Sequence, residues 1–246
     1  MLVQILASIL ISIGAEAQQA VTVYGDKEYR PYAYEENGEA RGIYVDILET
    51  AFARMADYEV NVVMVPWKRG LDYIRKGTGL ALFPPYHAPD RDSWMLFSEP
   101  ILEEQVVIFG KEETLAERKN WPEDFLGLRA GMNSGFSLTA LGGDRFAQAC
   151  RSGEIDLQEV NSTEQNLKKL SLGRIHFYLN DRLTDIGKFP SVQRGMVTAS
   201  NNGHLGFTRV DGDYPYLRDF KKSFDATIRE MKDSGEIDRI VKDYLK

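Results

Sequence analysis

Cysteine and histidine are scarce in this sequence, and their scarcity excludes several kinds of site. Among 246 residues there is one cysteine, Cys150, so no disulfide can form within the chain. Cys150 also lies far from the start of the chain, where a lipid anchor would require it. The three histidines, His87, His176 and His204, lack the spacing of a metal-binding motif. We therefore expect neither a metal site nor a cofactor.

A block of basic residues is also missing. The formal net charge is −7, and no stretch of the chain concentrates its 30 Lys and Arg residues. Nucleic acids and anionic membranes bind to such stretches, so we expect neither as a partner. The hydrophobic content of 43% is enough for a substantial core, and the length allows one large domain or two small ones.

Long apolar runs are absent after the first residues. Residues 1–17 contain an apolar run of about a dozen residues closed by Ala15, Glu16 and Ala17, a small-x-small cleavage pattern. We interpret them as a signal peptide, and export without disulfides suits a bacterial periplasm. No basic residue precedes the run, so a buried N-terminal helix is the alternative. Cleavage would remove Glu16 as the only charge and leave −6. No later segment has the roughly 18 to 20 apolar residues of a membrane helix.

Strands and helices alternate from residue 20 onward. Residues 20–25 alternate as a strand does, and a long loop rich in turn residues follows them. Residues 43–57 place apolar side chains at helical spacing, residues 58–65 read as a strand, and residues 67–77 as a helix that ends at glycine. This order predicts a largely parallel sheet with helices on its faces.

Two extended segments divide the chain. Residues 103–111 leave the first unit, and a second α/β unit follows, in which Ser162 and Gln165 form a capping box at the start of a helix. Residues 204–217 are the second extended segment, and two amphipathic helices split at Gly235 complete the chain. We expect two lobes: residues 18–108 with 207–246, and residues 109–206, with hinge strands near 103–111 and 204–210.

One local pattern occurs twice. An amphipathic helix, a glycine and an apolar strand lead to Arg91, and the same order leads to Asn180 and Asp181. A guanidinium and a carboxylate that come from two halves of a chain in this way could hold the two charged ends of an amino acid between them.

Six segments in order carry a resemblance to a known family. They are GDKEYRPYAY, RGIYVDILETAF, the R-x5-FSEP arrangement that begins at Arg91, RAGMNSGFS, LGRIHFYLND and MKDSGEIDRIVKDYL. Together they resemble the periplasmic solute-binding proteins of the polar amino acid type, the bacterial extracellular solute-binding protein family 3. The resemblance implies an α/β fold of two lobes with mixed, mostly parallel sheets and a two-strand hinge, in which the C-terminal segment completes the first lobe.

The resemblance also implies roles for particular residues. Arg91 matches the arginine that binds the ligand carboxylate, and Asp181 matches the acid that accepts hydrogen bonds from the ligand ammonium. The other matches are Asp26 and Tyr29 after the first strand, Trp67 as the opposite wall, Tyr86 as added aromatic surface, and Ser137 with Phe136 in the second-lobe turn. The alternatives are structural: Arg91 would brace its loop, Asp181 would be a turn acid, and the aromatic residues would pack at the edge of the core.

The chain departs from the family pattern just before Arg91. Phe83, Pro84, Pro85 and Tyr86 stand where small donors are common, and proline has no N–H to donate. Phe136 also replaces a hydroxyl residue. These differences favour a larger or more apolar ligand, such as an aromatic amino acid or a modified or cyclic relative.

The resemblance implies a binding protein rather than an enzyme. We expect a monomer that captures a small zwitterion or carboxylate, closes around it and delivers it to an ABC permease. An exported dehydratase of the cyclohexadienyl dehydratase type, with Asp26 or Asp181 as its acid, and a ligand-sensing protein of the same fold are the alternatives.

Overall fold

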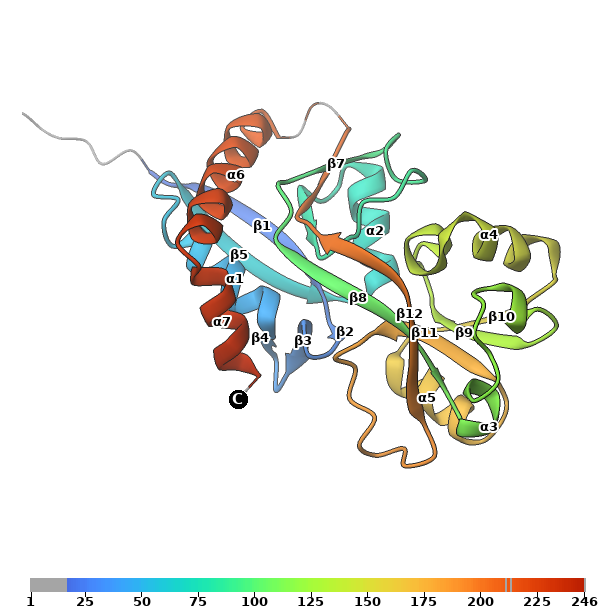
Figure 1. Ribbon diagram of the computed structural model, residues 1–246. Coiled ribbons are helices and arrows are strands. Elements are labelled where there is room, and N and C mark those ends of the chain that lie inside the picture. The colour runs from blue at the N-terminus through green and yellow to red at the C-terminus, as the bar shows by residue number, and fades with distance from the viewer. Residues whose placement is uncertain (1–16, 211, 213, 246) are drawn as a thin grey trace, which may run out of the picture.

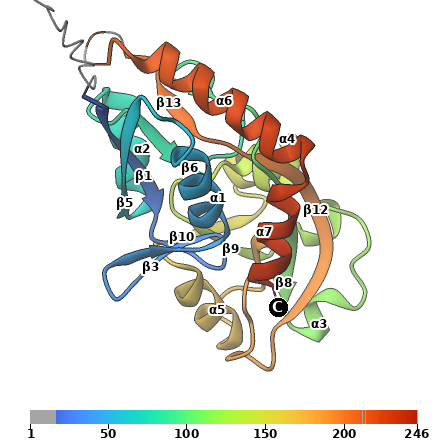
Figure 2. The same ribbon diagram turned by 90° about the vertical axis from the view of Figure 1, so that its left-hand side faces the viewer.

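Figure 1 shows the computed structural model, which describes residues 17–210, 212 and 214–245. The expected signal peptide, residues 1–17, lies outside the described residues except for Ala17. Two five-stranded sheets with helices around them form the body of the molecule, as Figures 1 and 2 show. Both sheets mix parallel and antiparallel pairs, which confirms the expected fold class.

The first sheet has the strand order β5-β1-β6-β13-β7. Its parallel strands are β1 (Gln19–Asp26), β5 (Tyr58–Val65) and β6 (Ala81–Phe83). The strand β13 (Gly206–Thr208) runs antiparallel between β6 and β7 (Met95–Phe97). We call this sheet and the helices on it the first lobe.

Four helices cover the first sheet: α1 (Ile43–Phe52), α2 (Trp67–Lys76), α6 (Leu217–Asp233) and α7 (Glu236–Tyr244). Helix α6 packs Phe220 and Phe224 into the same core as Val21 and Val23 of β1, so segments far apart in the sequence meet in the first lobe. Figure 2 shows α6 and α7 beside α1. Gly235 separates α6 from α7 with a left-handed φ of 68°, at the residue where the sequence predicts the split.

Helix α2 ends as the sequence predicts. Leu71 and Ile74 are buried on one face, and Gly77 closes the helix with φ 74° and ψ 10°. A Cβ at Gly77 would lie 2.6 Å from the Cβ of Val210, so this position needs glycine both for its backbone conformation and for space. The sharp end of α2 returns the chain into β6 and places the following loop at the carboxyl edge of the first sheet.

The second sheet has the order β10-β9-β11-β8-β12. Its strands are β10 (Asp156–Val160), β9 (Arg129–Asn133), β11 (Phe177–Asp181), β8 (Leu102–Gly110) and β12 (Gln193–Gly203). Its helices are α3 (Glu112–Leu115), α4 (Leu138–Ser152) and α5 (Thr163–Ser171), with a 3-10 turn at Glu123–Phe125. We call this unit the second lobe.

Local signals explain both long helices of the second lobe. Gly143 interrupts α4 with φ 81° and ψ 174°, a backbone conformation that favours glycine. At the start of α5 the Ser162 hydroxyl accepts a hydrogen bond from the Gln165 amide at 3.3 Å. The Gln165 side chain, however, accepts from the amide of Asn161 rather than that of Ser162, so one half of the predicted capping box is shifted by a residue.

Two segments differ from the sequence-based expectation. The predicted long loop after β1 contains a small antiparallel sheet of β2 (Glu28–Tyr29), β3 (Ala33–Glu36) and β4 (Glu39–Arg41). The strand β12 was not predicted. It pairs along β8 with shifts of register near Val197, and such irregular pairing removes the regular alternation by which a strand is recognised.

The chain passes between the lobes at two adjacent places. Leu102 at the start of β8 pairs with Gly203 at the end of β12, and β8 and β12 run side by side from there into the second lobe (Figure 1).

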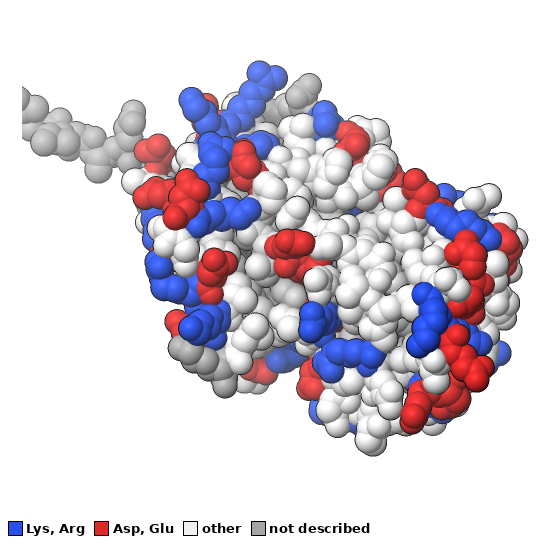
Figure 3. Space-filling view, in the orientation of Figure 1, with Lys and Arg blue, Asp and Glu red and all other residues white. Residues whose placement is uncertain are grey.

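Within the described part of the chain, no helix combines the length and apolar character needed to cross a membrane. On the face in Figure 3, acidic and basic side chains occur on both lobes.

Candidate functional site

A small cavity lies between the two lobes and is lined by residues of both. Its first-lobe walls come from the ends of β1 and β6, the start of α2 and the loops after β1 and β6; its second-lobe wall is the turn from β9 into α4. The carboxyl ends of parallel strands form ligand sites in α/β proteins because several loops converge there. The cavity has a volume of about 30 Å³, room for only a few water molecules. Direct hydrogen bonds from Trp67 and Arg91 to Gly135 join its two sides, so the lobes are closed on one another.

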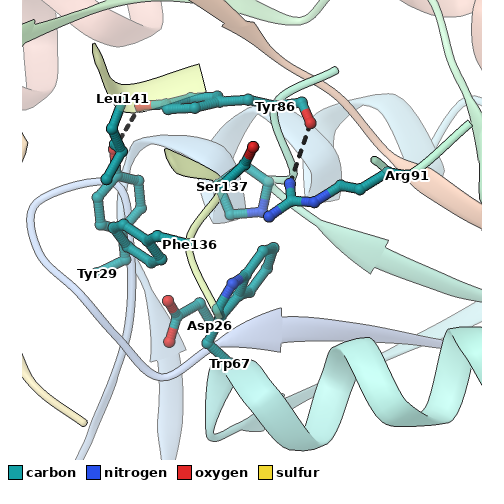
Figure 4. Close-up of a pocket in the computed structure, with 9 residues that line it drawn as sticks. Asp26, Tyr29, Trp67, Tyr86, Arg91, Phe136, Ser137 and Leu141 are labelled. Atoms are coloured by element: carbon teal, nitrogen blue, oxygen red, sulfur yellow. Dashed lines mark hydrogen bonds between the residues drawn. The ribbon is translucent and has the colours of Figure 1, made fainter. Parts of the chain in front are cut away.

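Seven of the eight predicted site residues line this cavity: Asp26, Tyr29, Trp67, Tyr86, Arg91, Phe136 and Ser137. Figure 4 shows these side chains around a common space. Two further residues, Pro84 and Leu141, complete the lining. The structure therefore brings together residues that lie far apart in the sequence, while the role of each stays a prediction.

Arg91 is the basic group of the cavity. It is 4% exposed, and its guanidinium donates to the carbonyl of Tyr86 at 3.0 Å and to that of Gly135 at 3.2 Å. It also lies 5.7 Å from the centre of the Trp67 ring. Burial lowers its pKa to about 10, so it stays charged at neutral pH. Among the described residues no carboxylate forms a salt bridge with Arg91.

The contacts of Gly135 hold the lobes together. Its carbonyl, in the second lobe, accepts hydrogen bonds from Arg91 and from the Trp67 indole, the latter at 3.2 Å. Nearby, Ser137 caps α4 by accepting from the Ala140 amide and donates to Asp90 of the first lobe at 3.1 Å. The hydroxyl predicted to meet a ligand carboxylate thus contacts a first-lobe acid in this closed state.

Asp26 is the acidic group of the cavity. It is 3% exposed, and the amide of Glu28 donates to its Oδ1 at 3.0 Å. Burial raises its pKa to about 7, although the hydrogen bond from Glu28 acts in the opposite direction. A carboxyl group with this pKa exchanges its proton near neutral pH, and a bound cation would favour the charged form.

Asp181 does not line the cavity. It is 1% exposed at the end of β11, where Oδ1 accepts hydrogen bonds from the Tyr32 hydroxyl and the Leu183 amide, both at 2.6 Å. Its Oδ2 is buried and has no partner among the described residues. Burial raises the pKa of Asp181, although these hydrogen bonds oppose the shift. The predicted pair of Arg91 and Asp181 is therefore not joined in one cavity here, and the role of Asp181 stays a prediction.

Aromatic rings form most of the remaining walls. Phe136 meets Tyr29 and Trp67 edge-to-face, with ring centres 6.0 and 6.3 Å apart and interplanar angles of 88°. Tyr32 stacks on the far side of Tyr29 at 5.1 Å. Edge-to-face contacts bring the positive edge of one ring to the negative face of another, so this group of rings is packed specifically.

Sequence reasoning missed Glu104, which lies behind the cavity and binds the hydroxyls of Tyr29 and Tyr86. A signal was present. In β8 the side chains of Glu104, Val106 and Ile108 share one face of the strand and are buried, whereas Glu103 and Gln105 are exposed. An acid in register with two buried apolar residues predicts a buried carboxyl group.

The fold and the cavity define the protein as a two-lobed α/β protein with a cavity between its lobes. Residues 21–246 match the family model of the bacterial extracellular solute-binding proteins, family 3, so the chain belongs to that family. A search among curated proteins found no match.

Solved structures share this fold at low sequence identity. The arginine-, lysine-, histidine-binding protein ArtJ from Geobacillus stearothermophilus is 18% identical, with a TM-score of 0.71 over 92% of this chain and 95% of that one. A histidine kinase sensor domain is 16% identical, with a TM-score of 0.78 over 93% and 96%. An ancestral amino acid-binding protein, a precursor of cyclohexadienyl dehydratase, is 17% identical, with a TM-score of 0.72 over 92% and 95%.

Proposed function

We propose that this protein binds a small zwitterionic, amino-acid-like solute outside the cytoplasm and presents it to an ABC importer. The observation that carries the proposal is the buried guanidinium of Arg91, which lines the cavity between the lobes without a carboxylate partner among the described residues. A guanidinium has five N–H donors in a planar fork, and a ligand carboxylate can accept two of them at once.

Two acids in or near the cavity can bind the ammonium group of the ligand. Asp26 lines the same cavity as Arg91, and Asp181 lies nearby with an unsatisfied Oδ2. Buried acceptors are normally paired, so a ligand ammonium that reaches either acid would satisfy it. We therefore assign the ligand carboxylate to Arg91 and the ammonium to Asp26 or Asp181.

Ligand binding in this scheme works by hinge closure. The cavity is too small for an amino acid, so the ligand would enter between separated lobes and replace the direct contacts of Trp67 and Arg91 with Gly135. The two lobes would move as units about the paired strands near Leu102 and Gly203, which lie close to the boundaries that the sequence predicts between residues 18–108 with 207–246 and residues 109–206. A ligand that contacts both lobes favours the closed state through its higher affinity for it.

The aromatic residues that line the cavity indicate the class of ligand. The cavity has aromatic surface, which favours an aromatic amino acid or a cyclic or modified relative; it comes from Tyr29, Trp67, Tyr86 and Phe136.

The family supports a location outside the cytoplasm, and residues 1–17 would direct the chain to the periplasm. We further propose that the protein acts as a monomer with a permease as its partner; the permease is supported by an amino acid ABC transporter substrate-binding protein that has the same fold.

A thermal-shift screen over amino acids, betaines, polyamines and organic acids tests the proposal. A ligand at about 100 times its Kd stabilises the native state by about 2.7 kcal/mol, which raises the Tm by about 5–10 °C in a chain of this size. We expect Arg91→Ala to abolish the shift. Arg151→Ala removes an exposed arginine in the last turn of α4 and should keep it. No shift with any zwitterion would refute the proposal.

A dehydratase is the second candidate, and Asp26 is the observation in its favour. A pKa of about 7 makes this carboxyl group a proton donor at neutral pH, as a general acid must be. The ancestral precursor of cyclohexadienyl dehydratase has the same fold, which supports this candidate at the level of the fold. Incubation of the purified protein with prephenate or arogenate distinguishes the two functions, because turnover that is lost in Asp26→Asn would identify an enzyme.

A further inference from the structure

A buried carboxyl group lies directly behind two walls of the cavity. Glu104 on β8 is 1% exposed and accepts hydrogen bonds from three tyrosines of the first lobe. The hydroxyls of Tyr29 and Tyr86 donate to its Oε2 at 2.5 and 2.8 Å, and that of Tyr44 on α1 donates to Oε1. The Tyr29 and Tyr86 hydroxyls also lie 2.8 Å from each other. We call these four residues the Glu104 cluster.

The chain makes room for this cluster at a cost in stability. Burial of a carboxyl group is unfavourable, and no cation forms a salt bridge with Glu104 in the described ranges. Gly203 on β12 provides the space: a Cβ there would lie 1.8 Å from the Tyr44 hydroxyl oxygen and 3.0 Å from Glu104 Oε1. An apolar side chain would fill this place at lower cost, so stability of the core does not account for the acid.

The cluster connects the cavity to the place where the chain passes between the lobes. The rings of Tyr29 and Tyr86 line the cavity, and their hydroxyls end on Glu104 (Figure 4 shows the two rings). Glu104 itself belongs to the second sheet, in which it pairs with Asn201 of β12. One side chain of the second sheet thus fixes two first-lobe walls at the base of the cleft.

We propose that Glu104 is a positioning residue of the ligand pocket, which holds the Tyr29 and Tyr86 rings as the ligand meets them. This inference rests on the proposed function, because it takes the cavity between the lobes as the place where the solute binds.

The groups that face Glu104 determine how its charge responds to pH. They are the hydroxyls of its three tyrosine partners and, farther away, Tyr32 and the Asp181 carboxyl on β11. Burial, and then the negative charge of Asp181, raise the pKa of Glu104 to about 8, while the hydrogen bonds from the tyrosines oppose the shift. The hydrogen bonds from the tyrosines thus offset part of the cost of burying this carboxyl group.

Two measurements on the purified protein test the inference. Near-ultraviolet circular dichroism of the ligand-free protein at pH 6.5 reports how the aromatic rings are held. Calorimetric titration with L-phenylalanine at the same pH reports binding. The variants are Glu104→Gln, which keeps an acceptor without a titrating proton, Glu104→Ala, and the control Glu103→Ala, which removes the exposed neighbouring acid on the other face of β8.

We expect the near-ultraviolet spectrum of Glu104→Ala to differ from that of the wild type, and the spectra of Glu103→Ala and Glu104→Gln to match it. We also expect Glu104→Ala to bind L-phenylalanine at least about tenfold more weakly, the effect of about 1.4 kcal/mol. Glu104→Gln should restore most of that affinity.

The outcomes separate this inference from the proposed function. If the wild type does not bind L-phenylalanine, the ligand assignment fails, and the near-ultraviolet spectra alone decide the role of Glu104. If the spectrum of Glu104→Ala matches that of the wild type, Glu104 does not hold the rings and the inference is overturned. Binding by Glu104→Ala as strong as that of Glu103→Ala would likewise overturn it.

Discussion

Tyr32 donates a 2.6 Å hydrogen bond to Asp181 Oδ1 and so joins the loop between β2 and β3 in the first lobe to the end of β11 in the second. Oδ1 also accepts from the Leu183 amide at 2.6 Å, whereas Oδ2 is buried without a partner in the part of the chain that is described. Oδ1 of Asp181 is thus hydrogen-bonded within the closed protein, whereas Oδ2 can accept a hydrogen bond from another donor.

The first prediction concerns this second oxygen. Asp181→Asn replaces an anionic acceptor by an amide, so a ligand ammonium would lose its charge-assisted hydrogen bond. We expect binding to weaken by about 30-fold or more, which corresponds to the loss of about 2 kcal/mol or more for a buried charged partner. Titration calorimetry with the ligand that the thermal-shift screen identifies would measure this.

Tyr32→Phe is the matched control, because it removes the hydrogen bond to Oδ1 but keeps the ring and the acid. This variant should bind the ligand at least as well as the wild type. Equal affinities of Asp181→Asn and the wild type would mean that Asp26 alone meets the ammonium.

The second prediction is a pH dependence of stability. The pKa of Asp26 is about 7 in the folded protein against an ordinary value of 3.8, so the folded state binds more protons between these values. Stability from this group is fully present below about pH 4 and is lost as the pH rises through about 7. Asp26→Asn should therefore raise the free energy of unfolding at pH 8 by roughly 2–4 kcal/mol and reduce its pH dependence.

Urea denaturation at pH 5 and pH 8 measures this effect. Asp57→Asn, at an exposed acid, should leave the difference between the two pH values unchanged. An Asp26→Asn variant that is no more stable than the wild type at pH 8 would show that the carboxyl group is charged and well solvated.

The third prediction concerns Phe136. Its edge-to-face contacts with Tyr29 and Trp67 close one side of the cavity. In Phe136→Ser these contacts are lost and a hydroxyl is gained, so aromatic ligands should lose about 1–3 kcal/mol of binding free energy while small polar amino acids lose less. The thermal-shift screen, repeated on the variant, would reveal a changed order of ligands; an unchanged order would contradict a role for Phe136 in selectivity.

The fourth prediction tests the packing around Gly203. Gly203→Ala would place a methyl group 1.8 Å from the Tyr44 hydroxyl oxygen and 2.6 Å from the ring carbon that carries it. We expect a loss of about 1–3 kcal/mol of stability, seen as a lower Tm in thermal unfolding. Tyr44→Phe in the same background should recover part of the loss because it removes the closest atom. A Tm equal to that of the wild type would mean that α1 and β12 are not packed as described.

Much of the fold could be predicted because local rules produce it. The alternation of strands and helices up to α2 follows from apolar periodicity, and the end of α2 at Gly77 and the break at Gly235 follow from the conformational freedom of glycine. The small sheet β2–β4 and the strand β12 were missed, because their stability comes from pairing with distant or irregular partners rather than from their own pattern.

The candidate site shows the same division. The resemblance marked Arg91 and its neighbours, and comparison with the family pattern identified the aromatic and proline residues before Arg91 as unusual. Glu104 and the contacts of Asp181 became visible only in three dimensions, since they depend on side chains from β8, α1 and two loops that meet behind the cavity.

The sequence by itself determined the types of local structure, the lack of disulfides and the chemical groups available for binding. These follow from periodicity, composition and the preferences of single residues, which act over a few positions. The tertiary structure decided which of these groups share one cavity. It placed Asp26 with Arg91, left Asp181 bonded to Tyr32, and put Glu104 behind Tyr29 and Tyr86. Such choices depend on how two separate sheets pack, and packing is a property of the whole chain.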